Sequence, residues 1–185
     1  MKIIYTLLAV IVIAIGGVVS FIYSGIYPIA ADVPHSDIEF WLLENLRDNA
    51  IERSSSHIKV PSLDSAELLL AGGPDYNEMC AGCHLKPGKK HSDLSIGLYP
   101  VPPNLSIYSH APDNDEGDAQ QQARRQFWVI KHGIKASGMP AWGPTHDDQR
   151  IWAMVAFLQK LPNLTPEQYQ ILTARGVDED QAAQH

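Results

Sequence analysis

The sequence predicts an all-α protein, in which a transmembrane helix and a juxtamembrane helix precede a small helical domain. Three observations support this fold class. Residues 3–26 contain no charged side chain, apolar residues recur every three or four positions in later segments, and loops rich in proline and glycine separate these segments. We divide the chain into an anchor (1–27), a juxtamembrane helix with a linker (28–63), a main domain (64–162) and a C-terminal short helix with a flexible tail (163–185).

The uncharged run follows Lys2 and predicts a helix about 36 Å long, enough to cross a membrane core of about 30 Å. Tyr5 and Tyr23 lie near its two ends, as interfacial aromatic residues often do. The alternative is a signal peptide cleaved near Ala30-Ala31, but the run is longer than a usual signal core. We favour a single-pass anchor in the inner (cytoplasmic) membrane. Lys2 then stays in the cytoplasm, and the rest of the chain faces the periplasm or an equivalent outer space.

Within residues 28–63, four apolar side chains recur at helical spacing: Ile38, Trp41, Leu42 and Leu46. This stripe either packs on the chain's own main domain, which is the commoner use of such a stripe, or docks on a membrane partner. Serines 54–56 and Pro61 then indicate a linker.

Four residues at the start of the main domain share one helical face: Leu68, Gly72, Tyr76 and Cys80. Pro74 interrupts this helix and predicts a kink or a new first turn. A stiff loop at 99–105, an acidic loop at 113–118, a short helix at 123–134 and a last strong helix over 145–162 complete the domain.

The motif Cys80-Ala81-Gly82-Cys83-His84 is typical of covalent attachment of one haem c. The spacing sets both thiols against one edge of the porphyrin, where each adds to a vinyl group, and His84 supplies the proximal ligand to iron. A thioredoxin-like pair would lack the adjacent histidine. A zinc site would need further ligands at knuckle spacing, and the chain has no other cysteine.

An electron carrier holds iron from both faces, so that little rearranges when the charge changes. Met139 is our candidate for the second axial ligand, because Gly138 and Pro140 bracket it in a short loop. His132 and His146 are rivals, which we expect to be exposed at helix ends. Two other methionines, Met79 and Met154, fit the usual role of filling a core.

These pieces together resemble the class I cytochromes c. The matching motifs are Gly72-x3-Tyr76-x3-Cys80, the Cys-x-x-Cys-His pentapeptide, Pro103-Asn104-Leu105, Gly138-Met139-Pro140-Ala141-Trp142, and Trp152 on the last helix. The resemblance implies that Gly72 and Tyr76 cross near Trp152. It also implies that the Pro103 carbonyl accepts a hydrogen bond from His84. The implied haem pocket is supported by Tyr76, Pro103, Asn104, Leu105 and Trp142, and the resemblance strengthens the choice of Met139.

The predicted function is single-electron transfer between respiratory-chain or membrane redox partners, without a small-molecule substrate. Two alternatives remain: a subunit through which electrons enter a membrane oxidase, reductase or dehydrogenase complex, and a haem enzyme, against which the Met139 loop argues. The formal net charge of −7 argues against nucleic acid or an anionic membrane surface as a partner for the whole chain. Candidate docking residues for a redox partner are the lysines around the two ligand segments and the centre of the juxtamembrane stripe: Lys86, Lys89, Lys90, Lys131, Lys135 and Trp41.

Overall fold

The structure is a computed structural model that describes residues 1–107 and 116–175. All regular elements in these two ranges are helical, which confirms the all-α prediction. The last ten residues of the predicted tail, and residues 113–115 of the predicted acidic loop, lie outside the described residues. The described part of the chain forms two units, residues 1–34 and a second unit that begins at His35.

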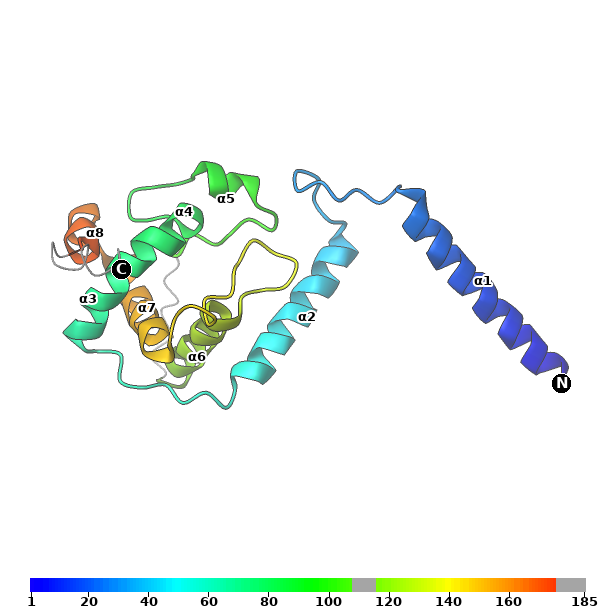
Figure 1. Ribbon diagram of the computed structural model, residues 1–185, viewed down its shortest axis with the longest axis horizontal. Helices are drawn as coiled ribbons and strands as arrows, with labels where there is room; N and C mark the ends of the chain where they lie inside the picture. Colours follow the sequence, from blue (N-terminus) through cyan, green and yellow to red (C-terminus); the bar gives the residue numbers. More distant parts are fainter. Residues whose placement is uncertain (108–115, 176–185) are drawn as a thin grey trace. The chain divides into compact units, whose positions relative to one another are not determined.

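The first unit contains helix α1 (Lys2–Ser24), drawn in blue in Figure 1. It is the one helix among the described residues that is long and apolar enough to cross a membrane, with a mean hydropathy of 2.6. It ends at Gly25, whose φ of 66° is the left-handed conformation that glycine adopts without strain. A signal sequence near the N-terminus can be as apolar as this helix, so the uncleaved anchor stays a prediction.

The second unit contains the juxtamembrane helix as well as the main domain. Helix α2 (Asp37–Ser55) begins with a capping box, in which Ser36 and Glu39 each accept from the other's backbone N–H. It continues into the serine run that the sequence analysis assigned to a linker, and Ser55 is fully buried. Serine is a weak helix former, but burial of this face against the domain outweighs its propensity.

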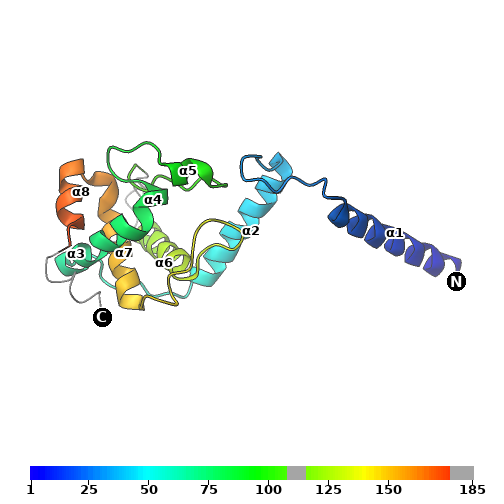
Figure 2. The same cartoon turned by 45° about the horizontal axis from the view of Figure 1, so that its top comes forward.

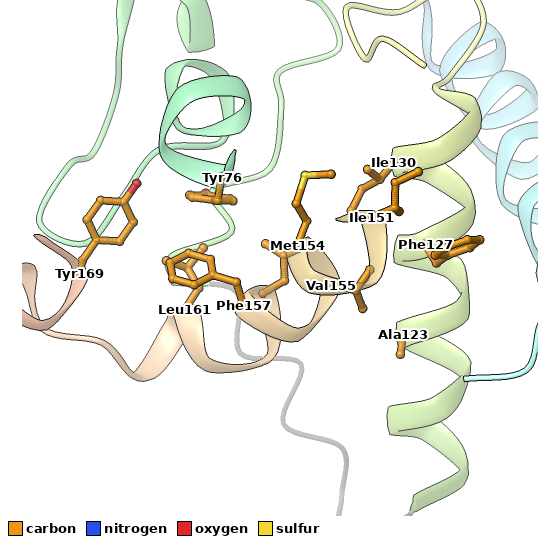
Figure 3. Packing of buried hydrophobic residues seen from close by; sticks show 11 residues of the cluster. Tyr76, Ala123, Phe127, Ile130, Ile151, Met154, Val155, Phe157, Leu161 and Tyr169 are labelled. Carbon is orange, nitrogen blue, oxygen red and sulfur yellow. The ribbon is translucent and has the colours of Figure 1, made fainter. Parts of the chain in front are cut away.

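The core forms where α3 (Ala66–Asp75) crosses α7 (Asp148–Lys160), while α6 (Glu116–His132) packs on the other side of α7. Figures 1 and 2 show this arrangement. In Figure 3 the side chains of α7 lie between Tyr76 and Phe127 of α6. A methyl group at Gly72 would overlap the backbone of Ala153, so the two helices cross at backbone contact beside Trp152. The side chain of Trp152 stacks on Phe127, with 4.2 Å between ring centroids.

The helix that begins with α3 does not restart at Pro74. It runs through the proline to Asp75, and a single π-helical turn, η1 (Tyr76–Cys80), connects it to α4 (Ala81–His84). Proline has no N–H to donate to the preceding turn, and wider turns of this kind re-satisfy a helix at such points. The backbone N–H of Tyr76 still bonds the carbonyls of both Gly72 and Gly73, so the helix is continuous up to the π-helical turn.

Three short elements complete the second unit: α5 (Asp93–Gly97), the 3-10 turn η2 (Leu161–Asn163) and α8 (Pro166–Thr173). Helix α8 is the predicted C-terminal short helix, and Thr165 caps it. A methyl group at Gly73 would overlap the backbone of Leu172, so α8 closes tightly over α3. Buried Asp75 also binds α7, because the Arg150 guanidinium donates to it twice, at 2.6 and 2.7 Å.

Candidate haem site

The two cysteines lie on consecutive turns, Cys80 at the end of η1 and Cys83 within α4. Both are half-buried and neither forms a disulfide. Burial, followed by the charges of Asp75 and Cys83, raises the pKa of the Cys80 thiol to about 12. Both sulfurs are thus available for other bonds, and Cys80 is a protonated thiol at neutral pH.

His84 is fixed by the loop that follows the motif. Its ring Nδ1 lies 2.9 Å from the carbonyl oxygen of Pro103, and its own carbonyl accepts from the N–H of Leu105 at 3.1 Å. Burial lowers the pKa of His84, while the hydrogen bond to Pro103 opposes this shift. A neutral imidazole whose Nδ1–H donates to Pro103 keeps Nε2 as a lone-pair donor, and no hydrogen bond to Nε2 exists among the described residues.

Tyr76 fixes the turn that directly follows His84. The residue after His84 is Leu85, which is 5% exposed and has a positive φ of 67°. This conformation costs a bulky L-residue about 1–3 kcal/mol and persists only where the surroundings enforce it. The buried hydroxyl of Tyr76 donates to the Leu85 carbonyl at 2.7 Å, and burial raises the pKa of Tyr76. The sharp chain reversal beneath His84 is therefore fixed by a protonated phenol.

The loop that carries Met139 is held on several sides. The Met139 carbonyl accepts from the N–H of Ile134 at 3.1 Å, and its N–H donates to the hydroxyl of Ser137 at 3.1 Å. A methyl group at Gly133 would lie 2.8 Å from the Met139 carbonyl oxygen, and one at Gly138 would lie 2.7 Å from Leu98. Met139 is half-buried and packs on the core, so its thioether has a defined position.

The structure brings six of the predicted site residues to one apolar cluster. Side chains packed on this cluster include Cys80, Leu105, Met139, Trp142 and Trp152, and Tyr76 belongs to it. Asn104 lies in the adjacent loop, where its Oδ1 accepts from the hydroxyl and N–H of Ser106 at 2.7 and 3.0 Å. The loop from Pro103 to Leu105 is therefore ordered by its own side chain as well as by His84.

The rival histidines differ from each other. His132 is exposed at the end of α6, as expected. The expectation of an exposed His146 is wrong, because the ring packs edge-on against Trp142 with 5.3 Å between centroids and its Nε2 is buried. Nδ1 lies 2.8 Å from the Thr145 hydroxyl. The turn at Trp142–His146, bonded through Trp142 O to His146 N at 2.9 Å, folds the ring inward before α7 begins.

The lysines divide into two groups. Lys131 is paired with Asp148, and Lys86 lies 5.8 Å from the ring centroid of Tyr169. Lys86, Lys89, Lys90 and Lys135 are exposed. We call these four lysines the basic rim; they can meet a partner directly, whereas Lys131 is paired with Asp148.

Two contacts around the motif were not predicted from the sequence. The Ser92 hydroxyl, at the start of α5, donates to the Gly82 carbonyl at 2.5 Å, and Leu98 packs on Gly138 beside Met139. The pattern Ser92-x-x-Ser95, which forms a reciprocal cap, indicates the short helix in retrospect. Leu98 connects two segments forty positions apart, and no local pattern indicates such a contact.

A cavity of about 300 Å³ lies elsewhere, between α3 and α7, and is lined by Glu67, Leu68, Ala71, Asp147, Gln149, Arg150 and Ala153. None of the candidate ligands borders it. The cavity therefore gives no candidate ligand, and the atoms that could bind a haem belong to the pentapeptide and the Met139 loop. Two free sulfurs, an imidazole with one nitrogen held and the other available, and a fixed thioether on an apolar cluster fit covalent haem c.

The comparisons agree with this fit. Residues 67–158 match the family model described as "Cytochrome C oxidase, cbb3-type, subunit III". Neither the curated proteins nor the solved structures give a match. The matched range includes the pentapeptide, the Pro103 loop, the Met139 loop and most of α7. The chain therefore contains a class I c-type cytochrome domain, which implies covalently bound haem c and haem-based electron transfer.

Proposed function

We propose that the chain is a membrane-anchored monohaem carrier of single electrons between membrane redox partners. Cys80 and Cys83 would hold the haem through thioethers, and His84 and Met139 would bind its iron. One observation carries the proposal: His84 is fixed by two hydrogen bonds with the loop at residues 103–105, and Met139 is fixed within its own loop and packs on the apolar cluster that Cys80 also contacts. Ligands held in this way move little when the charge of a bound group changes.

Bound haem supplies the one-electron couple. The remaining roles belong to the chain. Pro103 fixes the tautomer and orientation of His84, Tyr76 fixes the turn after it, and the apolar cluster shields one side of Met139 from water. No proton transfer or bond-making step is required of a side chain, so we assign no catalytic residue.

A second candidate is a subunit fixed within a membrane oxidase, through which electrons enter. The description of the matched family favours it, because that family is named for a subunit of an oxidase. Purification in mild detergent distinguishes the two. A free carrier migrates at the size of one chain in its micelle, whereas co-migration of the haem with larger subunits through two successive columns would overturn the proposal of a free carrier.

Topology gives a direct prediction. The positive end at Lys2 should remain in the cytoplasm, so a reporter fused after His185 should be active only when it requires export. A reporter that is active only in the cytoplasm would refute the topology. The mass of the purified chain checks the anchor separately, because a mature chain beginning near Ala31 or Asp32 would show that α1 is cleaved.

The basic rim gives a second prediction. Reversing Lys89 and Lys135 to glutamate, one from each ligand segment, should slow oxidation of the haem by an anionic iron–cyanide complex about threefold or more at low salt. Oxidation by a cationic cobalt complex should become faster. Both effects should shrink as salt rises, since the Debye length falls to about 8 Å near physiological ionic strength.

Lys59→Glu with Lys160→Glu is the matched control, because it changes the net charge equally at lysines outside both ligand segments. Its rates with both oxidants should stay near wild type. Equal effects from the two pairs would mean that only overall charge matters, and the rim would then have no special place in docking.

A further inference from the structure

Helix α2 is fixed to the domain at both ends. Near its C-terminal end Ile51 and Ser55 are buried, and Glu52 of α2 binds Arg125 of α6 at 2.9 Å. Hydrogen bonds from Gln121 and then Arg125 lower the pKa of Glu52, so the carboxylate stays charged at neutral pH. Just before its N-terminal end, the His35 N–H donates to the Tyr99 hydroxyl at 3.0 Å. The helix is therefore part of the haem domain, as Figures 1 and 2 show for its side-by-side position with α6.

Most of the apolar stripe of α2 lies on the opposite face, whereas Trp41 lies between the two faces and is also exposed. Its exposed fractions are 78% for Ile38, 64% for Trp41, 57% for Leu42 and 65% for Leu46. At about 100° per residue, the centre of Ile38, Leu42 and Leu46 lies roughly 180° around the helix from Ile51. The helix thus packs on its own domain, but through Ile51 and Ser55, and the predicted stripe faces outward.

Four polar side chains beside this stripe already form hydrogen bonds or ion pairs within α2 or its cap. The Asn45 amide donates to the Trp41 carbonyl at 2.7 Å, and the Asn49 amide donates to the Asn45 carbonyl at 2.8 Å. Glu39 accepts from the Ser36 N–H at 2.8 Å, and Glu44 pairs with Arg47 at 3.3 Å. The two asparagine amides, which already have partners, therefore lose less when they leave water than unpaired amides would.

The chain itself limits how far this stripe can be from a membrane. The candidate span α1 ends at Ser24 and α2 begins at Asp37. Residues 25–36 connect them, and twelve residues extend at most about 43 Å. Tryptophan with aliphatic neighbours is typical of the boundary between headgroups and acyl chains.

We propose that Ile38, Trp41, Leu42 and Leu46 lie in the lipid interface of the membrane that α1 spans. This inference rests on the proposed anchor. Because α2 is fixed to the domain, insertion of the stripe holds the domain in one orientation at the membrane surface. The acidic residues of α2 and the net charge of −7 give no attraction to anionic headgroups, so the insertion is apolar in origin and strongest in zwitterionic lipid.

The test uses the full-length holoprotein in phosphatidylcholine vesicles. A nitroxide is attached at position 42 through Leu42→Cys, and at position 46 in a second variant through Leu46→Cys. The matched control is Gln170→Cys, at an exposed position on α8. Positions 42 and 46 should collide readily with oxygen, and at least about threefold less than the control with a water-soluble nickel complex, since interfacial residues sit about 5–10 Å into the bilayer boundary. Adding anionic lipid should weaken this protection.

Nickel collision equal to that at position 170 would overturn the proposal. Protection from nickel and oxygen alike, or dipolar broadening between labels, would also overturn it, in favour of a protein partner or a second copy. Chain mass and the haem spectrum are recorded on the same samples. A chain that lacks α1 but remains protected at position 42 would refute the anchor and keep the interfacial stripe. An intact anchored cytochrome with position 42 open to nickel would keep the carrier function and refute the stripe.

Discussion

Replacing Met139 by alanine is expected to abolish the charge-transfer band between thioether sulfur and ferric iron while the haem stays covalently attached. The thioether is held by a loop bonded to Ile134 and packed on Leu98, and the substitution removes the sulfur without touching these contacts. The midpoint potential should fall by on the order of 0.1–0.3 V, because methionine favours ferrous iron and axial ligands set potentials over a range of about 0.8 V. Spectra, a haem stain after denaturing electrophoresis and a redox titration measure the three quantities.

Met79→Leu is the matched control. Met79 is half-buried and adjacent to Cys80, so this variant also removes one sulfur near the motif but should keep the band and the potential. An unchanged band in Met139→Ala would refute the assignment. His146, whose Nε2 is buried and makes no hydrogen bond in the described part of the chain, would then be the next residue to replace.

Signals carried by adjacent residues predicted most of the helices. Thr165-Pro166 predicts the start of α8, because caps are made within one turn. The helix expected to open at Thr145 instead begins at Asp148, with Asp147 as its cap. The π-helical turn η1 was not predicted. It depends on how the helix after Pro74 meets α7 and α8, and the proline alone is equally compatible with a kink or a new start.

The apolar pattern of α2 shows why periodicity did not determine its orientation. The helix has apolar residues on two faces, Ile51 on one and Ile38, Leu42 and Leu46 on the other. An apolar stripe more often packs on its own domain, and this tendency predicts that the face with Ile38, Leu42 and Leu46 meets the domain. The structure instead has Glu52 and Asp48 against Arg125, at 2.9 and 3.8 Å, on the two turns of α2 that also carry buried Ile51 and Ser55. The face of α2 that packs thus depends on Arg125 of α6, about seventy positions further along the chain. The residue pattern within α2 carries no information about this partner.

Within the candidate site, the pentapeptide and the Met139 loop could be predicted because each is contiguous in sequence. The contacts that hold them in place were harder to predict. The His84–Pro103 contact came from the family resemblance, whereas the contacts of Ser92 with Gly82 and of Leu98 with Gly138 join segments through the fold. A sequence motif thus identifies which atoms can bind, and the fold determines what holds those atoms still.

Replacing Gly72 by alanine is expected to destabilise the domain by about 1–2 kcal/mol. Alanine in a helix interior is ordinarily favoured over glycine by about 1 kcal/mol. Here the new methyl group would overlap the backbone of Ala153 on α7, and overpacking against backbone costs about 1–3 kcal/mol, occasionally more. The helices must separate, which also loosens Trp152 and the π-helical turn that carries Cys80. Denaturant unfolding of the full-length holoprotein in detergent, followed by circular dichroism, should show a lower midpoint with an unchanged slope.

Gly97→Ala is the matched control, since a methyl group there would meet nothing within 4 Å at the end of α5. Its midpoint should stay at or slightly above that of wild type, because alanine also restricts the unfolded chain. The pair separates a general effect of losing glycine from the specific crossing of α3 and α7. A Gly72→Ala protein as stable as Gly97→Ala would mean that the helices do not meet at backbone distance. The position of Cys80 would then need another support than the Gly72–Ala153 contact.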